Sequence, residues 1–137
     1  MAKPVVVDTN VLIDYFAGVS PSAEAVQRLL ETDRLGVTTL TVFELHCGVQ
    51  REELQQDIEL LVDASRIVLH LSIEAARRAA EQFRDLKRKG QVLPTQDLLI
   101  AGCCLAAGLP LLTRNRQHFS RLTQLELVEF HEVEDIS

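Results

Sequence analysis

Acidic residues stand at three junctions where a short apolar segment of this chain gives way to a helical pattern. Asp8 follows three valines in VVVDTNVLIDYF. Glu44 lies in TLTVFE, in the predicted first turn of one helix, and Asp97 lies in LPTQD, in the predicted first turn of another. A carboxylate in the interior of a buried strand is costly because a charge needs a partner or water. At the last residue of a strand it lies instead at the mouth of a sheet, where ligands bind. The three acids are therefore candidates for holding a cation.

The chemistry of such a site follows from repulsion between like charges. Two carboxylates about 4 Å apart repel by roughly 4 kcal/mol at an effective dielectric constant of 20. A bound cation would offset this cost for Asp8, Glu44 and Asp97. Hard oxygen ligands without a supporting histidine or thiolate favour Mg²⁺ or Mn²⁺ over zinc.

Each acid also has a purely structural alternative. Asp8 can cap the helix that follows it. Thr41-x-x-Glu44 matches a capping box, in which Glu44 would bond only the Thr41 backbone N–H. Asp97 can be an acid in the first turn of a helix, stabilised by the helix dipole. The sequence leaves both interpretations of each residue open.

The segment LLTRNRQHF supplies a candidate fourth site residue. Thr113 ends an apolar run, and Asn115 opens the next segment at the same kind of junction. Asn115 can equally cap a helix. His118 is interpreted as a surface or packing residue, and Asp14 as structural.

The segments that would position these residues alternate between short apolar strands and helical patterns. Strands are expected at 4–8, 36–39, 66–71, 110–113 and 125–130. Helices are expected at 10–17, 22–33 and 41–48, through Leu54, Ile58 and Leu61, at 72–89, and from Pro94 to Gly108. This alternation predicts an α/β fold with a parallel sheet covered on both faces. In such a sheet the ends of the strands and the starts of the following helices share one edge, so Asp8 and Glu44 can meet there. Asp97 can join them if its helix starts beside the same edge.

The composition is that of one soluble domain. The chain has 137 residues, of which 47% are hydrophobic and 25% charged, which suits a single domain over residues 1–137. No apolar run reaches the length of a membrane span, and the N-terminus lacks a signal peptide. Cys47, Cys103 and Cys104 are interpreted as reduced, buried thiols. A cytoplasmic protein without a membrane partner is expected.

Basic residues are concentrated in two places despite a net charge of −6. The 72–89 helix, predicted to bury Ile73, Ala76, Ala80, Phe83 and Leu86, ends in Lys87, Arg88 and Lys89. Arg114, Arg116 and Arg121 form the second group. This distribution is compatible with a phosphate-binding face on an acidic protein. The alternative is a solvated helix face.

Taken together, these motifs resemble PIN-domain ribonucleases, specifically the VapC toxins of prokaryotic toxin–antitoxin pairs. The resemblance covers essentially the whole chain through VVVDTNVLIDYF, TLTVFELHCG and PTQDLLIAGCCLAAGLPLLTRNRQHF. It implies a three-layer fold with a central twisted parallel sheet flanked by helices. It also implies that Asp8, Glu44 and Asp97 bind Mg²⁺ or Mn²⁺, with Asn115 as the fourth catalytic position. Many relatives have aspartate at that fourth position and asparagine where this chain has Gln96.

The activity implied by the resemblance is metal-dependent endonucleolytic hydrolysis of RNA by a toxin. The implied partners are the RNA substrate, a small antitoxin protein and a second copy of the chain. Arg114 and Arg116 are expected to contact the RNA backbone, as is the basic end of the 72–89 helix, Lys87 to Lys89.

Other activities fit the residues less well. A PIN nuclease that processes RNA without an antitoxin is the nearest alternative. A phosphotransferase with a D-x-D motif would need an acid at Asn10. A receiver-like binding module would need an adjacent acidic pair after the first strand and a lysine near a late strand, and the sequence has neither.

Overall fold

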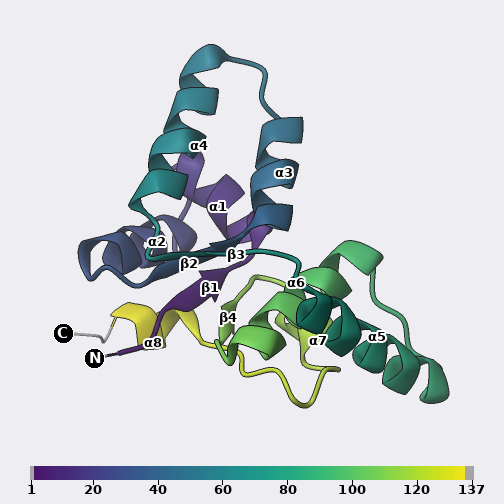
Figure 1. The fold of residues 1–137 in the computed structure, drawn as a ribbon. Helices are drawn as coiled ribbons and strands as arrows, with labels where there is room; N and C mark the ends of the chain where they lie inside the picture. Colours follow the sequence, from purple (N-terminus) through teal and green to yellow (C-terminus); the bar gives the residue numbers. More distant parts are fainter. Residues whose placement is uncertain (1, 135–137) are drawn as a thin grey trace.

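The protein folds as a parallel sheet between two layers of helices (Figure 1). The structure, a computed structural model, describes residues 2–134. The strands are β1 (Val5–Val7), β2 (Leu35–Thr38), β3 (Ile67–Leu69) and β4 (Leu111–Leu112). They lie in the order β3-β2-β1-β4, and every pair is parallel. The predicted three-layer α/β fold is confirmed.

Six helices of the described chain form where the sequence predicts them, with ends shifted by one or two residues, and two further short helices were not predicted. The six are α1 (Thr9–Phe16), α2 (Ser22–Glu31), α3 (Thr39–Cys47), α4 (Glu52–Ala64), α5 (Ile73–Arg88) and α6 (Thr95–Ala107), and the two that were not predicted are α7 (Arg116–Phe119) and α8 (Phe130–Glu134). The helices from α1 to α4 lie on one side of the sheet in Figure 1, and α5, α6 and α7 lie on the other. These crossovers are the connections that parallel strands require.

The alternating side chains of β1 separate the two halves of the core. Val5 and Val7 pack with buried residues of α1, α2 and α4, whereas Val6 packs with α6 and Phe119. Successive residues of a strand point to opposite faces, so three consecutive valines are all buried only if both faces are covered. Burial on both faces therefore fixes β1 near the centre of the sheet, next to β2 and β4.

The predicted strand at 125–130 is wrong. Within this segment only an isolated parallel bridge, between Leu127 and Leu111, joins the sheet, and α8 begins at Phe130. Leu125 packs in the half of the core beside α6, whereas Val128 packs in the other half. A bend at Leu125 and the start of α8 at Phe130 limit the pairing of this segment with β4 to that one bridge.

The predicted apolar face of α5 is also wrong except at Leu86. The buried residues of the helix are Ala75, Ala79, Gln82 and Leu86, while Ile73 is 72% and Phe83 45% exposed. The small buried residues let α6 approach closely. A Cβ atom at Gly102 of α6 would lie 2.3 Å from the Ala75 carbonyl oxygen and 2.9 Å from Ala79 Cβ.

The cysteines follow the expectation in part. Cys103 and Cys104 are buried in α6, but Cys47 at the end of α3 is exposed. All three are free thiols, as predicted. Within residues 2–134, no helix is both long and apolar enough to cross a membrane.

The close approach of α5 and α6 gives a first prediction. Gly102→Ala should lower the free energy of unfolding by about 1–3 kcal/mol, because the added methyl overlaps the Ala75 carbonyl and forces the helices apart. This loss should appear although alanine favours helices over glycine. Gly48→Ala is the control, because its Cβ would meet nothing closer than 3.7 Å and its φ is −91°. Urea unfolding of both variants measures the difference, and equal stability would show that the helices tolerate the methyl.

Candidate functional site

Asp8 lies at the carboxyl edge of the sheet, directly after β1, and is only 4% exposed. Its Oδ1 accepts a hydrogen bond from the Thr9 backbone N–H at 2.9 Å, and its Oδ2 accepts one from the Thr113 hydroxyl at 2.7 Å. The predicted alternative, that Asp8 caps α1, is therefore correct. Each carboxylate oxygen has two lone pairs, so one on each oxygen remains for a cation.

The electrostatics of Asp8 follow from its burial. Loss of solvent raises the pKa of the Asp8 carboxyl, and the hydrogen bonds from Thr113 and Thr9 act against this rise. The negative charge of Glu44 raises the pKa further. A nearby cation would stabilise the ionised carboxylate and would therefore lower the pKa of Asp8.

Glu44 lies on α3, the helix that follows β2, and β2 lies beside β1 in the sheet. Glu44 is the sixth residue of α3, so its predicted place in the first turn of the helix is wrong. The capping box is also wrong, because the Thr41 N–H donates to the Thr38 hydroxyl at 3.1 Å. Glu44 Oε1 instead accepts a hydrogen bond from the Thr9 hydroxyl at 2.8 Å. The side chain therefore links α3 to the first residue of α1.

Asp97 completes the acidic group. It lies in the first turn of α6, as predicted, and its side chain is half-buried. Burial raises the pKa of Asp97 to about 6, the charges of Asp8 and Glu44 raise it as well, and His118 acts in the opposite direction. The three acids are thus near enough to repel one another. In the described chain, no hydrogen-bond donor compensates the Asp97 carboxylate.

The donor set fits a hard divalent ion in its chemistry but is not arranged as a finished binding site. Among residues 2–134, no three His, Cys, Asp or Glu side chains are grouped closely enough to hold a metal ion. The Asp8 and Glu44 carboxylates are held by hydrogen bonds. The half-buried Asp97 side chain accepts none in the described chain, so it is the acid that can move toward the other two.

Asn115 lies on the loop after β4 and is connected to Asp8 through Thr113. Its backbone N–H donates to the Thr113 hydroxyl oxygen at 3.0 Å, and that hydroxyl donates to Asp8. Asn115 occupies the N-cap position of α7, but its exposed side chain makes no capping hydrogen bond. The amide is therefore free to act at the site. His118, on α7, is exposed and lies near enough to Asp97 to influence its pKa.

The loop that carries Asn115 is fastened to α1. The Arg114 guanidinium pairs with Asp14 at 3.0 Å, and the Arg114 backbone N–H donates to Asn10 Oδ1 at 3.4 Å. Asp14 Oδ2 also accepts a hydrogen bond from the Ser22 hydroxyl. The predicted structural role of Asp14 agrees with these contacts.

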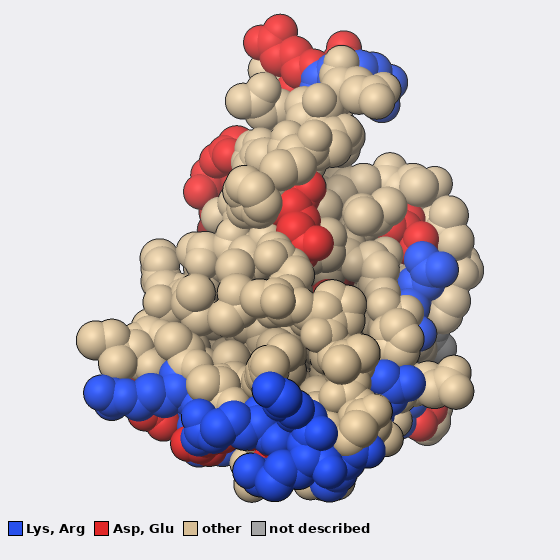
Figure 2. All heavy atoms as spheres, turned by 90° about the vertical axis from the view of Figure 1, so that its right-hand side faces the viewer, with Lys and Arg blue, Asp and Glu red and all other residues tan. Residues whose placement is uncertain are grey.

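Some of the predicted RNA-contacting residues form ion pairs within the chain, and others do not. Arg114 pairs with Asp14, Arg116 pairs with Glu129 at 3.1 Å, and Arg88 pairs with Asp85. Lys87 and Lys89 are exposed and form no ion pair with a described residue; Lys87 lies over the Phe83 ring at 6.0 Å. Figure 2 shows Lys and Arg gathered along the lower edge of one face, at the level of α5 in Figure 1, below acidic side chains near its centre.

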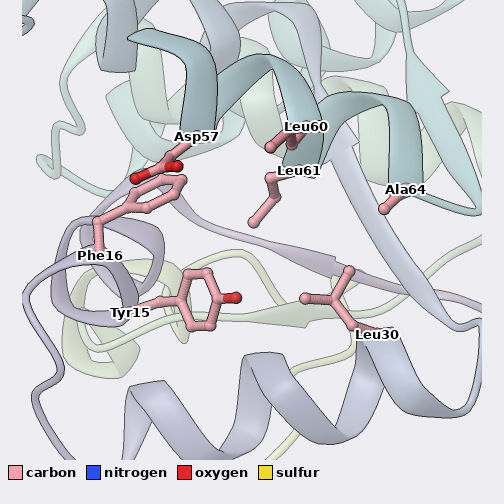
Figure 3. Close-up of a pocket in the computed structure, with 7 residues that line it drawn as sticks. All are labelled: Tyr15, Phe16, Leu30, Asp57, Leu60, Leu61 and Ala64. Carbon is pink, nitrogen blue, oxygen red and sulfur yellow. The ribbon is translucent and has the colours of Figure 1, made fainter. Parts of the chain in front are cut away.

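One groove of the described surface lies away from Asp8, Glu44 and Asp97. It has a volume of about 530 Å³ and runs between α1, α2 and α4 (Figure 3). Tyr15, Phe16, Leu30 and Leu60 give it apolar walls, with Asp57 at one end. None of the four predicted catalytic residues lines this groove.

The structure adds two residues that the sequence analysis did not assign to the site. Thr113 holds Asp8, and Thr9 contacts both Asp8 and Glu44. The sequence shows only that Thr113 directly follows a strand and that Thr9 directly follows the acid at the end of a strand. These positions indicate a role at the site only once β4 is known to lie beside β1.

Comparison with known proteins gives a consistent result for most of the chain. The family model described as PIN domain matches residues 5–125. Ribonuclease VapC1 of Haemophilus influenzae strain R2866 is 32% identical over 125 residues, which cover 87% of this chain and 92% of that protein. Ribonuclease VapC1 of Methanocaldococcus jannaschii is 29% identical over 123 residues, covering 90% and 84%.

Solved structures agree with the fold. VapBC-1 from nontypeable Haemophilus influenzae superposes with a TM-score of 0.77 at 31% identity, covering 93% of this chain and 98% of that one. VapBC2 from Rickettsia felis, bound to a DNA fragment from its promoter, gives a TM-score of 0.78 over 90% and 96%. At 21% identity, the second likeness shows the fold alone.

The raised pKa of Asp97 predicts a dependence of stability on pH in EDTA. The folded-state pKa of about 6 exceeds the unfolded value of about 3.9, so between these pH values the folded state binds more protons. The free energy of unfolding contributed by Asp97 therefore falls as pH rises from about 4 to about 6. At pH 8, Asp97→Asn should be at least as stable as the wild type.

Glu74→Gln is the matched control for this measurement. Glu74 is an exposed acid in the first turn of α5 and is not among the charges that act on the site. Its loss should cost under about 1 kcal/mol by weakening the interaction with the helix dipole. Thermal melts at pH 5 and pH 8 compare the two variants with the wild type. A loss for Asp97→Asn that matches the control would mean that Asp97 serves only its helix.

Proposed function

This chain belongs to the PIN-domain family and, within it, to the VapC ribonucleases, and on that premise we propose that it is a divalent-metal-dependent endoribonuclease. We further propose that it acts as the toxin of a type II toxin–antitoxin pair. The observation that carries the proposal is the mutual repulsion of Asp8, Glu44 and Asp97 at one edge of the sheet. A cation bound between the three acids would explain why they lie close together although, in the described chain, no donor compensates the charge of Asp97.

The proposed metal ligands are the three acids, and the proposed ion is Mg²⁺, with Mn²⁺ as a substitute. Oxygen ligands are the kind both ions prefer. A bound divalent ion supplies activation of a water molecule and stabilisation of the charge on the leaving oxygen. Asp8 and Glu44 provide fixed positions through their hydrogen bonds, and Asp97 would move toward them.

Asn115 is the proposed fourth catalytic residue. Its amide oxygen can bind a water or a ligand of the ion, but it carries no charge. A site with three rather than four negative charges favours one principal ion over two. The Thr113 hydroxyl accepts from the Asn115 backbone and donates to Asp8, and this link between Asn115 and Asp8 supports the proposed role.

Lys87 and Lys89 are the proposed main contacts to RNA phosphates. They lie at the end of α5, whose following loop leads to α6 and Asp97. Both ammonium groups are exposed, and neither must leave an ion pair to bind RNA. Arg88, Arg114 and Arg116 could contact RNA only by exchanging an existing carboxylate partner.

An antitoxin and a second copy of the chain are the proposed protein partners in the cytoplasm. VapBC-1 from nontypeable Haemophilus influenzae is a similar solved structure, and VapBC is the name of a family of toxin–antitoxin systems. The exposed apolar side chains suited to protein contacts include Leu60 at the groove of Figure 3, and Ile73 and Phe83 on α5. A PIN nuclease that works without an antitoxin is the alternative. A neighbouring gene for a small DNA-binding protein whose product co-purifies with this chain would decide between them.

The activity should depend on the metal and on Asp8. Purified protein should cleave RNA internally with Mg²⁺ or Mn²⁺ and stop when EDTA is added. Asp8→Asn should lower the cleavage rate by a factor of order 10³ or more, since it removes the fixed ligand. Asp63→Asn, an exposed change on α4, should cleave at the wild-type rate. Cleavage that persists in EDTA, or a fully active Asp8→Asn, would contradict the proposal.

The basic end of α5 should bind phosphate. Lys87→Glu combined with Lys89→Glu should weaken RNA binding and flatten its dependence on salt, because each lost phosphate contact reduces the slope by about 0.7 for single strands. Lys3→Glu with Arg66→Glu is the matched control, since both residues precede strands at the opposite edge of the sheet. Fluorescence anisotropy at several salt concentrations measures both pairs. Equal effects of the two pairs would indicate a general charge effect and place the RNA elsewhere.

A further inference from the structure

We infer that Thr9 is a positioning residue that holds the Glu44 carboxylate beside Asp8 so that both can bind one cation. The inference rests on the proposed metal site. It adds to that site a residue whose own atoms need not touch the ion. The Thr9 backbone N–H donates to Asp8 Oδ1 at 2.9 Å, and the Thr9 hydroxyl donates to Glu44 Oε1 at 2.8 Å. One residue thus contacts two acids that arrive on different elements.

The direction of these hydrogen bonds follows from proton counting. A threonine hydroxyl has a single proton, and the stronger acceptor for Thr9 is the Glu44 carboxylate. The hydroxyl oxygens of Thr9 and Thr41 lie 2.9 Å apart, so Thr41 donates to Thr9. The Thr38 hydroxyl, 3.3 Å from that of Thr41, donates to it in turn. The three hydroxyls form a chain that ends on Glu44.

Burial makes the Thr9 contact hard to replace. Thr9 is 8% exposed, and Thr38 and Thr41 are fully buried, so water does not substitute readily for a lost hydroxyl. Glu44 Oε1 is anchored by Thr9, whereas in the described chain no donor is bonded to Oε2. One oxygen therefore fixes the carboxylate, and the other remains for the ion.

A purely structural role is the competing explanation. The hydroxyl chain also joins α1 to α3, and removing any member of it should reduce stability. The two explanations differ in what they predict for metal binding. A positioning residue affects the affinity for the ion, while a link between helices affects only unfolding.

The test is a Mn²⁺ titration by calorimetry on RNA-free protein. Thr9→Val, nearly the same shape without the hydroxyl, should bind Mn²⁺ about 10- to 100-fold more weakly than the wild type, as is usual when a partner of a metal ligand is lost. Thr9→Ser, which retains the hydroxyl, should recover most of the affinity. RNA cleavage by Thr9→Val should be impaired most at low Mn²⁺ and recover as Mn²⁺ is raised.

Thr41→Val is the matched control. It breaks the same hydroxyl chain but leaves the Thr9 hydroxyl bonded to Glu44. It should lose stability like Thr9→Val and still bind Mn²⁺ with nearly wild-type affinity. If both variants lose affinity equally, or if neither does, Thr9 is a structural residue and the inference is wrong.

The remaining outcomes separate this inference from the proposed function. A wild type that binds no Mn²⁺ would refute the metal site and the role of Thr9 together. A wild type that binds Mn²⁺ while Thr9→Val binds it equally well would refute the role of Thr9 alone. Should Thr9→Val fail to fold, Thr9→Ala removes the same hydroxyl with a residue that favours helices and must show the same loss of affinity.

Discussion

The buried carboxylate of Asp8 is the constraint on which the rest of the site depends. A charge that is 4% exposed must receive hydrogen bonds from the protein in place of water. Its two donors come from the start of α1 and from the residue after β4. The pairing of Val7 with Leu112 sets the distance between them, and the Asp8 N–H donates to the Leu112 carbonyl. The position of β4 beside β1 therefore determines whether a buried carboxylate can be stabilised at the end of β1.

The meeting of the acids could be predicted because it depends on a general property of parallel sheets. Asp8 ends β1 and Glu44 lies on the helix after β2, and such residues share one edge of a parallel sheet. Asp97 was expected there only if its helix began beside that edge, because α6 follows α5 and not a strand. The partners of the acids could not be predicted in the same way. Glu44 bonds a residue 35 positions away, and Thr113 bonds one 105 positions away. Such pairs depend on which strands are neighbours, and hydrophobic periodicity contains no information on that.

The errors in the predicted fold have a similar origin. Alanines lie on several sides of α5, so periodicity could not tell the buried Ala75 and Ala79 from the exposed Ala76. Packing against α6 selects the buried face of α5, because α6 approaches so closely at Gly102 that only small residues of α5 fit there. The segment at 125–130 has an apolar pattern suited to a strand, and its apolar residues do lie in both halves of the core, but it pairs with β4 at a single bridge before α8 begins.

The site combines two acids held by hydrogen bonds with a third that is not held in this way, and this division suits a small, exacting ion. Mg²⁺ requires near-ideal octahedral geometry and retains several waters, so a fully preformed cage of side chains is not what it needs. Asp8 is held on both oxygens and Glu44 on one, while Asp97 is half-buried and accepts no hydrogen bond in the described chain. Burial raises the pKa of Asp97, and repulsion from Asp8 and Glu44 raises it further. That repulsion is the source of ion affinity, because a cation gains most where like charges are already held together. The fold can maintain it because the hydrogen bonds that fix Asp8 and Glu44 do not involve the ion.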